Sequence, residues 1–139
     1  MNSKNQRVEA AAQALSDNLA KAVSLIEKHS AVILRPDGTS EALALKHRGR
    51  FTFEEVQEWL GGYYEVVALT KLKKTMIMDE EGGLKGLPPN LAATYFFRQE
   101  MHSRVIPDGL PAPLTAFFDK SRNQTIVGDV IVCSRRHFK

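Results

Sequence analysis

Two acidic side chains interrupt apolar stretches that have the composition of β-strands. Glu65 lies within residues 63–69, and Asp129 lies beside a glycine within residues 126–132. A carboxylate among core side chains costs free energy unless it is paired or hydrogen-bonded. One interpretation is a polar pocket at the surface of a sheet that uses one or both acids. The other is structural: Glu65 pairs with a cation at a sheet edge, and Asp129 sits in a glycine bulge.

Residues close to these acids in the sequence could line the same pocket. Two tyrosines precede Glu65, an acidic turn covers residues 79–83, and a Leu-Pro-Pro bend leads to Asn90. Asn90 is also a good helix N-cap, and the acidic turn could serve only to keep a hairpin soluble. The residues predicted to bind a ligand or a partner are Tyr63, Tyr64, Glu65, Glu80, Asn90 and Asp129.

The sequence motifs of the common enzyme classes are absent. No phosphate-binding loop, nucleophile elbow, HExxH or CxxC motif occurs in the chain. Cys133, near the end of an apolar strand, is expected to be a core residue. We therefore predict no catalytic residue, no metal ligand and no cofactor. The enzymatic alternative is a metal-dependent hydrolase or nuclease that uses strand and turn carboxylates, namely Glu65, Asp79, Glu80 or Asp129.

Positive charge is concentrated in three short segments. The chain has 19 Lys and Arg against 16 Asp and Glu, which gives a net charge of +3. Basic segments can contact phosphates, but they can equally be solvated loops and a tail. The residues of the nucleic-acid-binding alternative are Lys46, Arg48, Arg50, Lys73, Lys74, Arg135 and Arg136.

The first half of the chain contains a long periodic segment and two local signals. Apolar residues recur every three or four positions over residues 8–29, which predicts an amphipathic helix able to pack on a sheet or pair with a second copy. A Pro-Asp-Gly turn predicts a hairpin between strands 31–34 and 41–45. Thr52 and Glu55 form a capping box for a helix that ends at a Gly-Gly pair, and Phe51 and Val56 hold its hydrophobic-staple positions.

The second half predicts the remaining sheet. Residues 63–69 are apolar on both faces, so this strand is expected in the middle of the sheet, with residues 75–79 as its partner. A helix over residues 91–102, a helical turn at 114–118 and a strand over 125–133 follow. The core residues expected on the first of these helices are Leu91, Tyr95 and Phe96. The predicted class is α+β: a long N-terminal helix, then a mostly antiparallel sheet with two or three helices packed on it.

The chain length of 139 residues is enough for one self-supporting core. The predicted organisation is an N-terminal amphipathic extension over residues 1–30, an α+β core domain over residues 31–133 and a basic tail over residues 134–139. No apolar run approaches the roughly 18 residues of a membrane span, and the polar N-terminus does not resemble a signal peptide. The single cysteine fits a reducing compartment, so we expect the protein in the cytoplasm.

An ordered set of motifs resembles a known family. These are Gly-Gly-Tyr-Tyr-Glu-Val-Val at residues 61–67, Asp-Glu-Glu-Gly-Gly-Leu-Lys-Gly-Leu-Pro-Pro-Asn at 79–90, Ala-Thr at 93–94 and Ile-Val-Gly-Asp at 126–129. Together they resemble a family of small bacteriophage and mobile-element proteins known only as a domain of unknown function, from about residue 31 to residue 133. The resemblance implies a compact α+β fold and a phage, plasmid or integrative-element origin, and it implies no catalytic residues.

These observations favour a binding protein over an enzyme. We expect a small phage or mobile-element accessory factor, acting in the host cytoplasm on a host protein or a small nucleotide ligand, for host modulation or counter-defence. Self-association through the helix of residues 8–29 is a further expectation, and no membrane partner is expected. The alternatives are the nucleic-acid-binding protein and the metal-dependent hydrolase described above.

Overall fold

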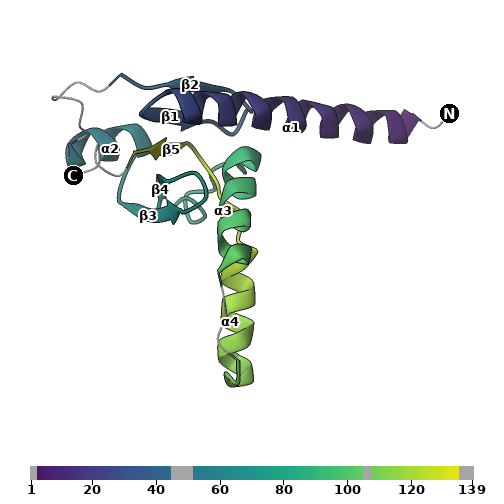
Figure 1. The fold of residues 1–139 in the computed structure, drawn as a ribbon, viewed down its shortest axis with the longest axis vertical. Helices are drawn as coiled ribbons and strands as arrows, with labels where there is room; N and C mark the ends of the chain where they lie inside the picture. The colour runs from purple at the N-terminus through teal and green to yellow at the C-terminus, as the bar shows by residue number, and fades with distance from the viewer. Residues whose placement is uncertain (1–2, 45–51, 105–107, 135–139) are drawn as a thin grey trace.

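The computed structural model describes residues 3–44, 52–104 and 108–134. Its elements, in chain order, are α1 (Ser3–Lys28), β1 (Ala31–Leu34), β2 (Ser40–Ala42), α2 (Phe53–Leu60), β3 (Tyr64–Leu69), β4 (Lys74–Asp79), α3 (Leu91–Ser103), α4 (Ala112–Arg122) and β5 (Val130–Cys133) (Figure 1). The predicted α+β class is confirmed, with a long N-terminal helix, an antiparallel sheet and three further helices within the described ranges.

The sheet has five strands in the order β2-β1-β5-β4-β3, and every neighbouring pair is antiparallel. β3 therefore lies at an edge, and the prediction that residues 63–69 form a middle strand is wrong. β3 pairs with β4 alone, and part of the face that it shares with α2 is uncovered. Val66 and Ala68 share a face with Tyr64 but remain exposed, Val66 to 44%. Apolar residues on both faces here reflect an incompletely covered edge strand.

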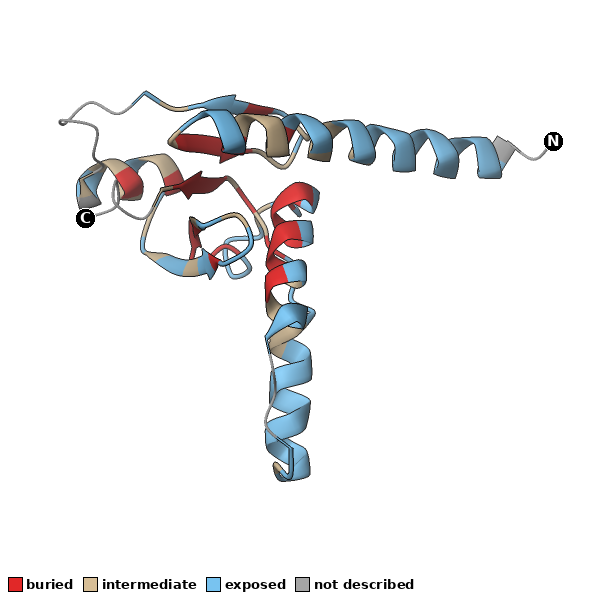
Figure 2. Ribbon diagram, viewed as in Figure 1, coloured by how far each residue is buried: buried red, intermediate tan, exposed pale blue. Residues whose placement is uncertain are grey.

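Each face of the sheet carries its own layer of core side chains, because successive residues of a strand point to opposite faces. One layer packs against α1 and α3 and includes Val32, Leu34, Met76, Met78, Val130 and Val132. The other packs against α2 and includes Ala31, Ile77, Ile131 and Cys133. The two layers place β5 and the middle of β4 in the most buried part of the molecule (Figure 2).

Only the C-terminal part of α1 belongs to this core. Ala22 and Ile26 are each 1% exposed, Leu19 is half-buried, and Val8 is 62% exposed. In Figure 1 the N-terminal part of α1 extends beyond the sheet, and in Figure 2 it is exposed along its length. The apolar stripe predicted over residues 8–29 is thus satisfied by the core at one end and uncovered at the other.

The predicted caps of α2 are confirmed. The Thr52 hydroxyl accepts from the Glu55 amide at 3.1 Å, and the Glu55 carboxylate accepts from the Thr52 amide at 3.3 Å. At the other end Gly61 adopts the left-handed conformation at φ 80°, which glycine tolerates without strain because it has no Cβ. Phe51 of the predicted hydrophobic staple lies outside the described residues.

The buried face of α3 is displaced by one position from the prediction. Phe96 is in the core at 4% exposure, but Leu91 and Tyr95 are 56% and 43% exposed, so their assignment to the core is wrong. The residues of α3 that are buried are Ala92, Ala93, Thr94, Phe96, Phe97 and Glu100. Because Asn90 fixes where the helix begins, the stripe of residues 92, 96 and 100 faces the sheet, and Leu91 and Tyr95 lie beside it.

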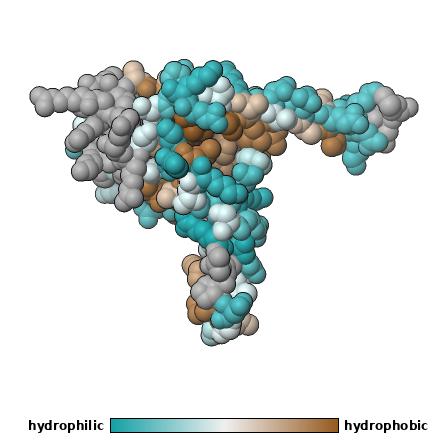
Figure 3. Space-filling view, viewed as in Figure 1, coloured by the Kyte–Doolittle hydropathy of each residue, from teal (hydrophilic) through white to brown (hydrophobic). Residues whose placement is uncertain are grey.

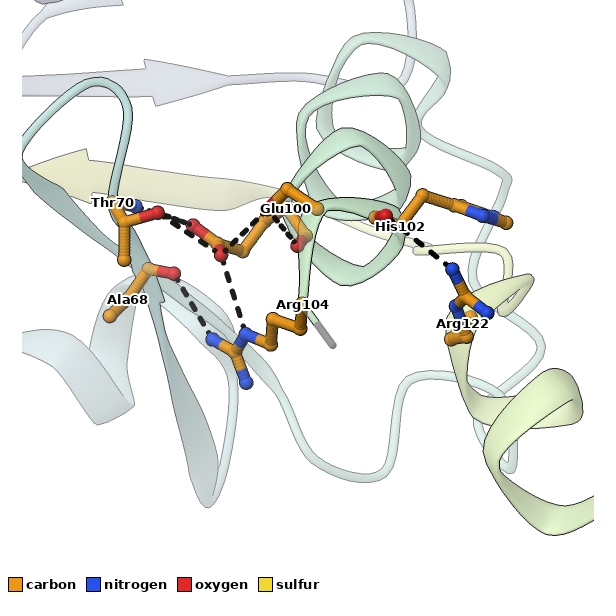
Figure 4. Close-up of polar contacts among 7 residues, drawn as sticks. Ala68, Thr70, Glu100, His102, Arg104 and Arg122 are labelled. Atoms are coloured by element: carbon orange, nitrogen blue, oxygen red, sulfur yellow. Dashed lines mark hydrogen bonds and ion pairs between the residues drawn. The ribbon is translucent and has the colours of Figure 1, made fainter. Parts of the chain in front are cut away.

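A buried carboxylate ties α3 to the edge of the sheet. Glu100 accepts hydrogen bonds from the amide of Thr70 and, at 2.8 Å, from its hydroxyl, and it pairs with Arg104 at 3.3 Å (Figure 4). Arg104 also donates to the Ala68 carbonyl at 3.3 Å. These contacts link the end of β3 to the last turn of α3.

The helical turn predicted at residues 114–118 is a complete helix, α4, of 11 residues. It has no buried residue, and its contacts with α3 are polar: Arg98 donates to the Asn123 carbonyl at 2.8 Å, and His102 lies 3.0 Å from the Asn123 side chain. The strand predicted over residues 125–133 is shorter, because Gly128 has a φ of 76° and interrupts it. None of the helices described is both long enough and apolar enough to span a bilayer.

Candidate ligand-binding cleft

A cleft of about 590 Å³ opens at one end of the sheet. We call it the Trp59 cleft. It lies where the β1–β2 turn, the end of α2 and two chain segments before α3 and β5 meet. Its lining residues are Arg35, Pro36, Asp37, Trp59, Leu60, Leu87, Pro88, Gly128 and Asp129.

The β1–β2 turn forms one wall of the cleft. Pro36 sets one backbone angle of the turn, and Gly38 adopts a φ of 90°. The Asp37 carboxylate accepts from the amide and hydroxyl of Thr39 at 2.9 and 2.6 Å, and these bonds hold the pKa of Asp37 below its usual range. The turn is therefore closed by its own side chains, which leaves the Arg35 side chain to face Glu41 and the cleft.

One buried side chain fixes the other walls. The Asn90 amide nitrogen donates to the Leu34 carbonyl at 2.9 Å and to the Gly128 carbonyl at 2.8 Å, while its oxygen caps α3 by accepting from Ala93 at 3.1 Å. Leu34 directly precedes Arg35, and Gly128 directly precedes Asp129. The Gly128 amide also donates to Pro88 at 2.8 Å. Asn90 is 0% exposed, and it holds three wall segments in one arrangement from below the cleft.

The charged groups of the cleft are unequally satisfied. Arg35 forms an ion pair with Glu41, and its pKa is raised, chiefly by that hydrogen bond and further by the charges of Glu41 and Asp129. Asp129 is half-buried, and among the described residues no hydrogen-bond donor or ion-pair partner contacts its carboxylate. A half-buried carboxylate without such a partner gains free energy when a ligand donates hydrogen bonds to it. In this cleft, Asp129 is therefore the group best placed to bind a hydrogen-bond donor.

The other predicted site residues lie elsewhere. Glu65 and Glu80 line a separate hollow of about 80 Å³ with Asp79, on the edge strand β3 and at the end of β4. Tyr63 is 64% exposed, and Tyr64 packs against the core layer beneath α2. The predicted pocket is thus divided between two places. Asp129 lines the Trp59 cleft and Asn90 supports it, whereas the other four residues lie on or next to the first half of β3.

The carboxylates near the start of β3 and the end of β4 have different surroundings. Asp79 is engaged by Lys85 at 2.7 Å and by the Glu81 amide at 2.8 Å, and Lys85 also reaches the Gly61 carbonyl at 3.0 Å. The pKa of Glu65 is raised, first by partial burial and then by the charge of Glu80. Within the described residues, no group of three or more His, Cys, Asp or Glu side chains could hold a metal ion.

The raised pKa of Glu65 predicts a pH-dependent stability. An acid whose pKa is higher in the folded state destabilises the fold once it ionises, so stability falls as the pH rises from about 4.3 through the folded pKa of Glu65. Glu65→Gln is therefore expected to raise the thermal midpoint at pH 7 and to flatten its decrease between pH 4 and 7. Thermal unfolding followed by circular dichroism checks this against Glu58→Gln, on exposed α2 surface. A lower midpoint for Glu65→Gln at pH 7 would contradict it.

The basic residues of the nucleic-acid alternative are described only in part. Lys73 is exposed, with a φ of 55°, and Lys74 donates to the Ser134 hydroxyl at 3.1 Å. Five predicted residues, Lys46, Arg48, Arg50, Arg135 and Arg136, lie outside the described residues. Cys133 is fully buried, which raises the pKa of its thiol to about 12, so its role is that of a core residue.

Sequence reasoning missed most of the cleft. Trp59 lies on the helix predicted before the Gly-Gly pair, Asp37 lies in the predicted Pro-Asp-Gly turn and Arg35 directly precedes it, so these patterns account for all three without a site. A usable signal was present: the chain's single tryptophan lies two residues before a helix-ending glycine pair, and a charged turn follows the first strand. What brings the two together is the sheet topology, which no local pattern contains.

Comparison with known proteins gives one family. Residues 26–138 match a family model described as Domain of unknown function (DUF3846). The matched range begins at Ile26, where α1 joins the core, and includes every residue of the Trp59 cleft. Searches of curated proteins and of solved structures give no match.

Proposed function

Because the chain belongs to the DUF3846 family, a domain of unknown function, we propose a function from its own geometry: it is a binding protein that holds a nucleobase-bearing small molecule in the Trp59 cleft. The observation that carries this proposal is the Asp129 carboxylate, which shares the Trp59 cleft with the tryptophan and accepts no hydrogen bond from any described residue. A concave apolar site with a few placed polar groups is the usual composition of a small-ligand site.

The charges around the cleft select the part of the ligand that enters. The Arg35 cation faces three carboxylates, those of Asp37, Glu41 and Asp129. The charges of these four described side chains add up to a negative value, which disfavours phosphate groups and favours groups that donate hydrogen bonds. The base is thus expected to enter the cleft, and any phosphate to remain in solvent.

A guanine-type base fits these requirements best. Its ring can stack on the tryptophan, which contributes about 1–3 kcal/mol per base in proteins that bind single strands. Its two adjacent N–H groups can donate in parallel to one carboxylate, as a guanidinium does. Asp129 is the carboxylate of the cleft that is available for this pairing, since Asp37 is occupied by Thr39.

The chain's single tryptophan makes the proposal directly measurable. Titration with guanosine is expected to change Trp59 fluorescence saturably, and guanosine 5′-triphosphate is expected to bind less tightly because of its charge. Cytidine and N-acetylarginine amide serve as comparison probes. No saturable change with any nucleoside up to about 5 mM would overturn the proposal, and saturation by the arginine probe alone would replace the nucleobase with a cationic protein side chain.

Removing the carboxylate charge tests the assigned role of Asp129. Asp129→Asn is expected to weaken guanosine binding at least tenfold, because an amide offers only one acceptor to two donors. The matched control is Asp119→Asn on exposed α4, which should leave the affinity unchanged. Equal affinity in Asp129→Asn and the wild type would contradict the assignment of this residue.

We also propose that the protein is encoded by a bacteriophage or another mobile element and acts in the host cytoplasm. The support is the motif resemblance over residues 61–67, 79–90 and 126–129. The genes that flank its coding sequence test this origin. Capsid, integrase or replication genes of a mobile element are expected, and a neighbourhood of housekeeping genes would contradict it.

A further inference from the structure

A second concave surface lies in the corner between α1 and α3. Two adjoining hollows of about 690 and 410 Å³ share Leu15 and Tyr95, and together we call them the α1–α3 groove. The α1 side supplies small and apolar side chains, among them Ala12, Leu19 and Val23. In Figure 3 the corner beneath α1 is the largest hydrophobic area on this face of the molecule.

The same chain carries a helix, α4, whose apolar side chains are exposed among the described residues. Leu114, Phe117 and Phe118 follow the spacing of one helix face, and they are 47%, 62% and 37% exposed. α4 has no buried residue and no side-chain cap. A helix of 11 residues is too short to be stable in water without packing. The apolar face of α4 therefore needs a surface to cover it.

The two surfaces match in size. At 1.5 Å per residue, α4 is about 16 Å long, and the α1 wall of the groove from Ala12 to Glu27 is about 24 Å long. The three α4 side chains expose roughly 300 Å² of apolar area at these fractions. With the smaller area that the groove offers, two reciprocal contacts give roughly 1,000 Å², the size that a specific interface has to reach.

α4 is held away from the groove of its own chain. It continues downward from α3, while α1 crosses above (Figure 1). Arg98 and His102 of α3 hold Asn123 at the end of α4, and Arg122 donates to the His102 carbonyl at 3.4 Å. These polar contacts hold α4 so that it projects away from the sheet, and we call α4 the arm.

We propose that α4 of a second copy of this chain occupies the α1–α3 groove, and that the contact is reciprocal in a two-fold dimer. A two-fold axis buries both apolar surfaces of both chains at once. The pairing differs from a coiled coil of two α1 helices, because α1 contributes a groove wall.

The first test is the oligomeric state of two single variants. The wild type is expected to be a dimer by sedimentation equilibrium. Phe117→Glu removes the most exposed apolar side chain of the arm. Leu15→Glu places a charge where the two hollows of the groove join. Each is expected to weaken dimerisation at least 30-fold, as loss of an interface anchor does. Leu84→Glu, at a position 90% exposed in the turn after β4, is the matched control and should remain dimeric.

Mixing the two variants distinguishes this dimer from the other arrangements. In a mixture, the intact arm of Leu15→Glu can enter the intact groove of Phe117→Glu, so one of the two contacts forms and a heterodimer is expected. A dimer of paired α1 helices would survive Phe117→Glu, and a dimer of paired α4 helices would survive Leu15→Glu. Either result overturns the proposal, as does a wild type that is monomeric at 0.5 mM.

Neither variant needs to disturb the fold, because neither side chain is buried in the core. Unreactive Cys133 thiol in each variant confirms that the sheet is intact. The guanosine titration of Trp59 should be unchanged in Phe117→Glu, so failure of the dimer and failure of the ligand proposal are separate results.

Discussion

Asn90→Ala is expected to lower the free energy of unfolding by about 3–5 kcal/mol, the largest effect of any single substitution considered for this chain. Loss of the helix cap accounts for about 1 kcal/mol. The rest comes from the carbonyls of Leu34 and Gly128, which lose their buried donor at about 1–2 kcal/mol each. Urea unfolding followed by circular dichroism measures it.

Two further variants separate the cap from the bridge. Asn90→Ser keeps a capping oxygen but cannot reach both carbonyls, so about 2–3 kcal/mol of the loss should remain. Asn123→Ala is the matched control: its side chain also makes two hydrogen bonds, but in an exposed position, and a change below about 1 kcal/mol is expected. If Asn90→Ser were as stable as the wild type, the bridge between wall segments would contribute nothing.

Glu100→Ala is expected to cost about 2–3 kcal/mol, because the Thr70 amide, the Thr70 hydroxyl and the Arg104 guanidinium lose their shared acceptor. Burial alone raises the pKa of Glu100, but the hydrogen bonds from Thr70 and Arg104 outweigh it and leave that pKa below its ordinary value. The stabilisation is therefore present above pH 4.3 or so and is lost as the pH falls through the folded pKa.

The acid branch of the stability curve checks this assignment. The wild type should lose stability more steeply below pH 4.3 than Glu100→Gln, which keeps an acceptor without a titrating group. Glu9→Ala, on the exposed part of α1, should follow the wild type at every pH. Identical acid branches for the wild type and Glu100→Gln would show that the Thr70 and Arg104 contacts do not depend on the charge of Glu100.

Local signals in the sequence predicted local structure well. The capping box at Thr52 and the cap at Asn90 involve atoms within three residues of each other, and both are confirmed. The donors of Asn90 bond to carbonyls 56 and 38 residues away, which no sequence pattern indicates. The prediction for the position of β3 was wrong for a related reason: which strands lie beside it depends on the order of the whole sheet, and the apolar composition of β3 does not contain that order.

The sequence identified individual residues of the candidate site, but it did not predict which of them lie together. Asp129 was identified because a carboxylate in an apolar strand is unusual, and the same argument identified Glu65. The structure separates them because Asp129 directly precedes the middle strand β5 and lines the cleft with the β1–β2 turn, while Glu65 lies on the edge strand β3. Trp59 lies near the end of α2, and the other residues that line the cleft belong to segments far away in the sequence.

The strand order has a consequence for biosynthesis. β5 is made after every other strand of the sheet, yet it lies between β1 and β4 and pairs with both. Until residue 133 has left the ribosome, the nascent chain holds two separate hairpins, each with an unpaired inner edge. Such edges readily pair with other chains. A chaperone would therefore have to protect the inner edges of β1 and β4 until β5 has been made.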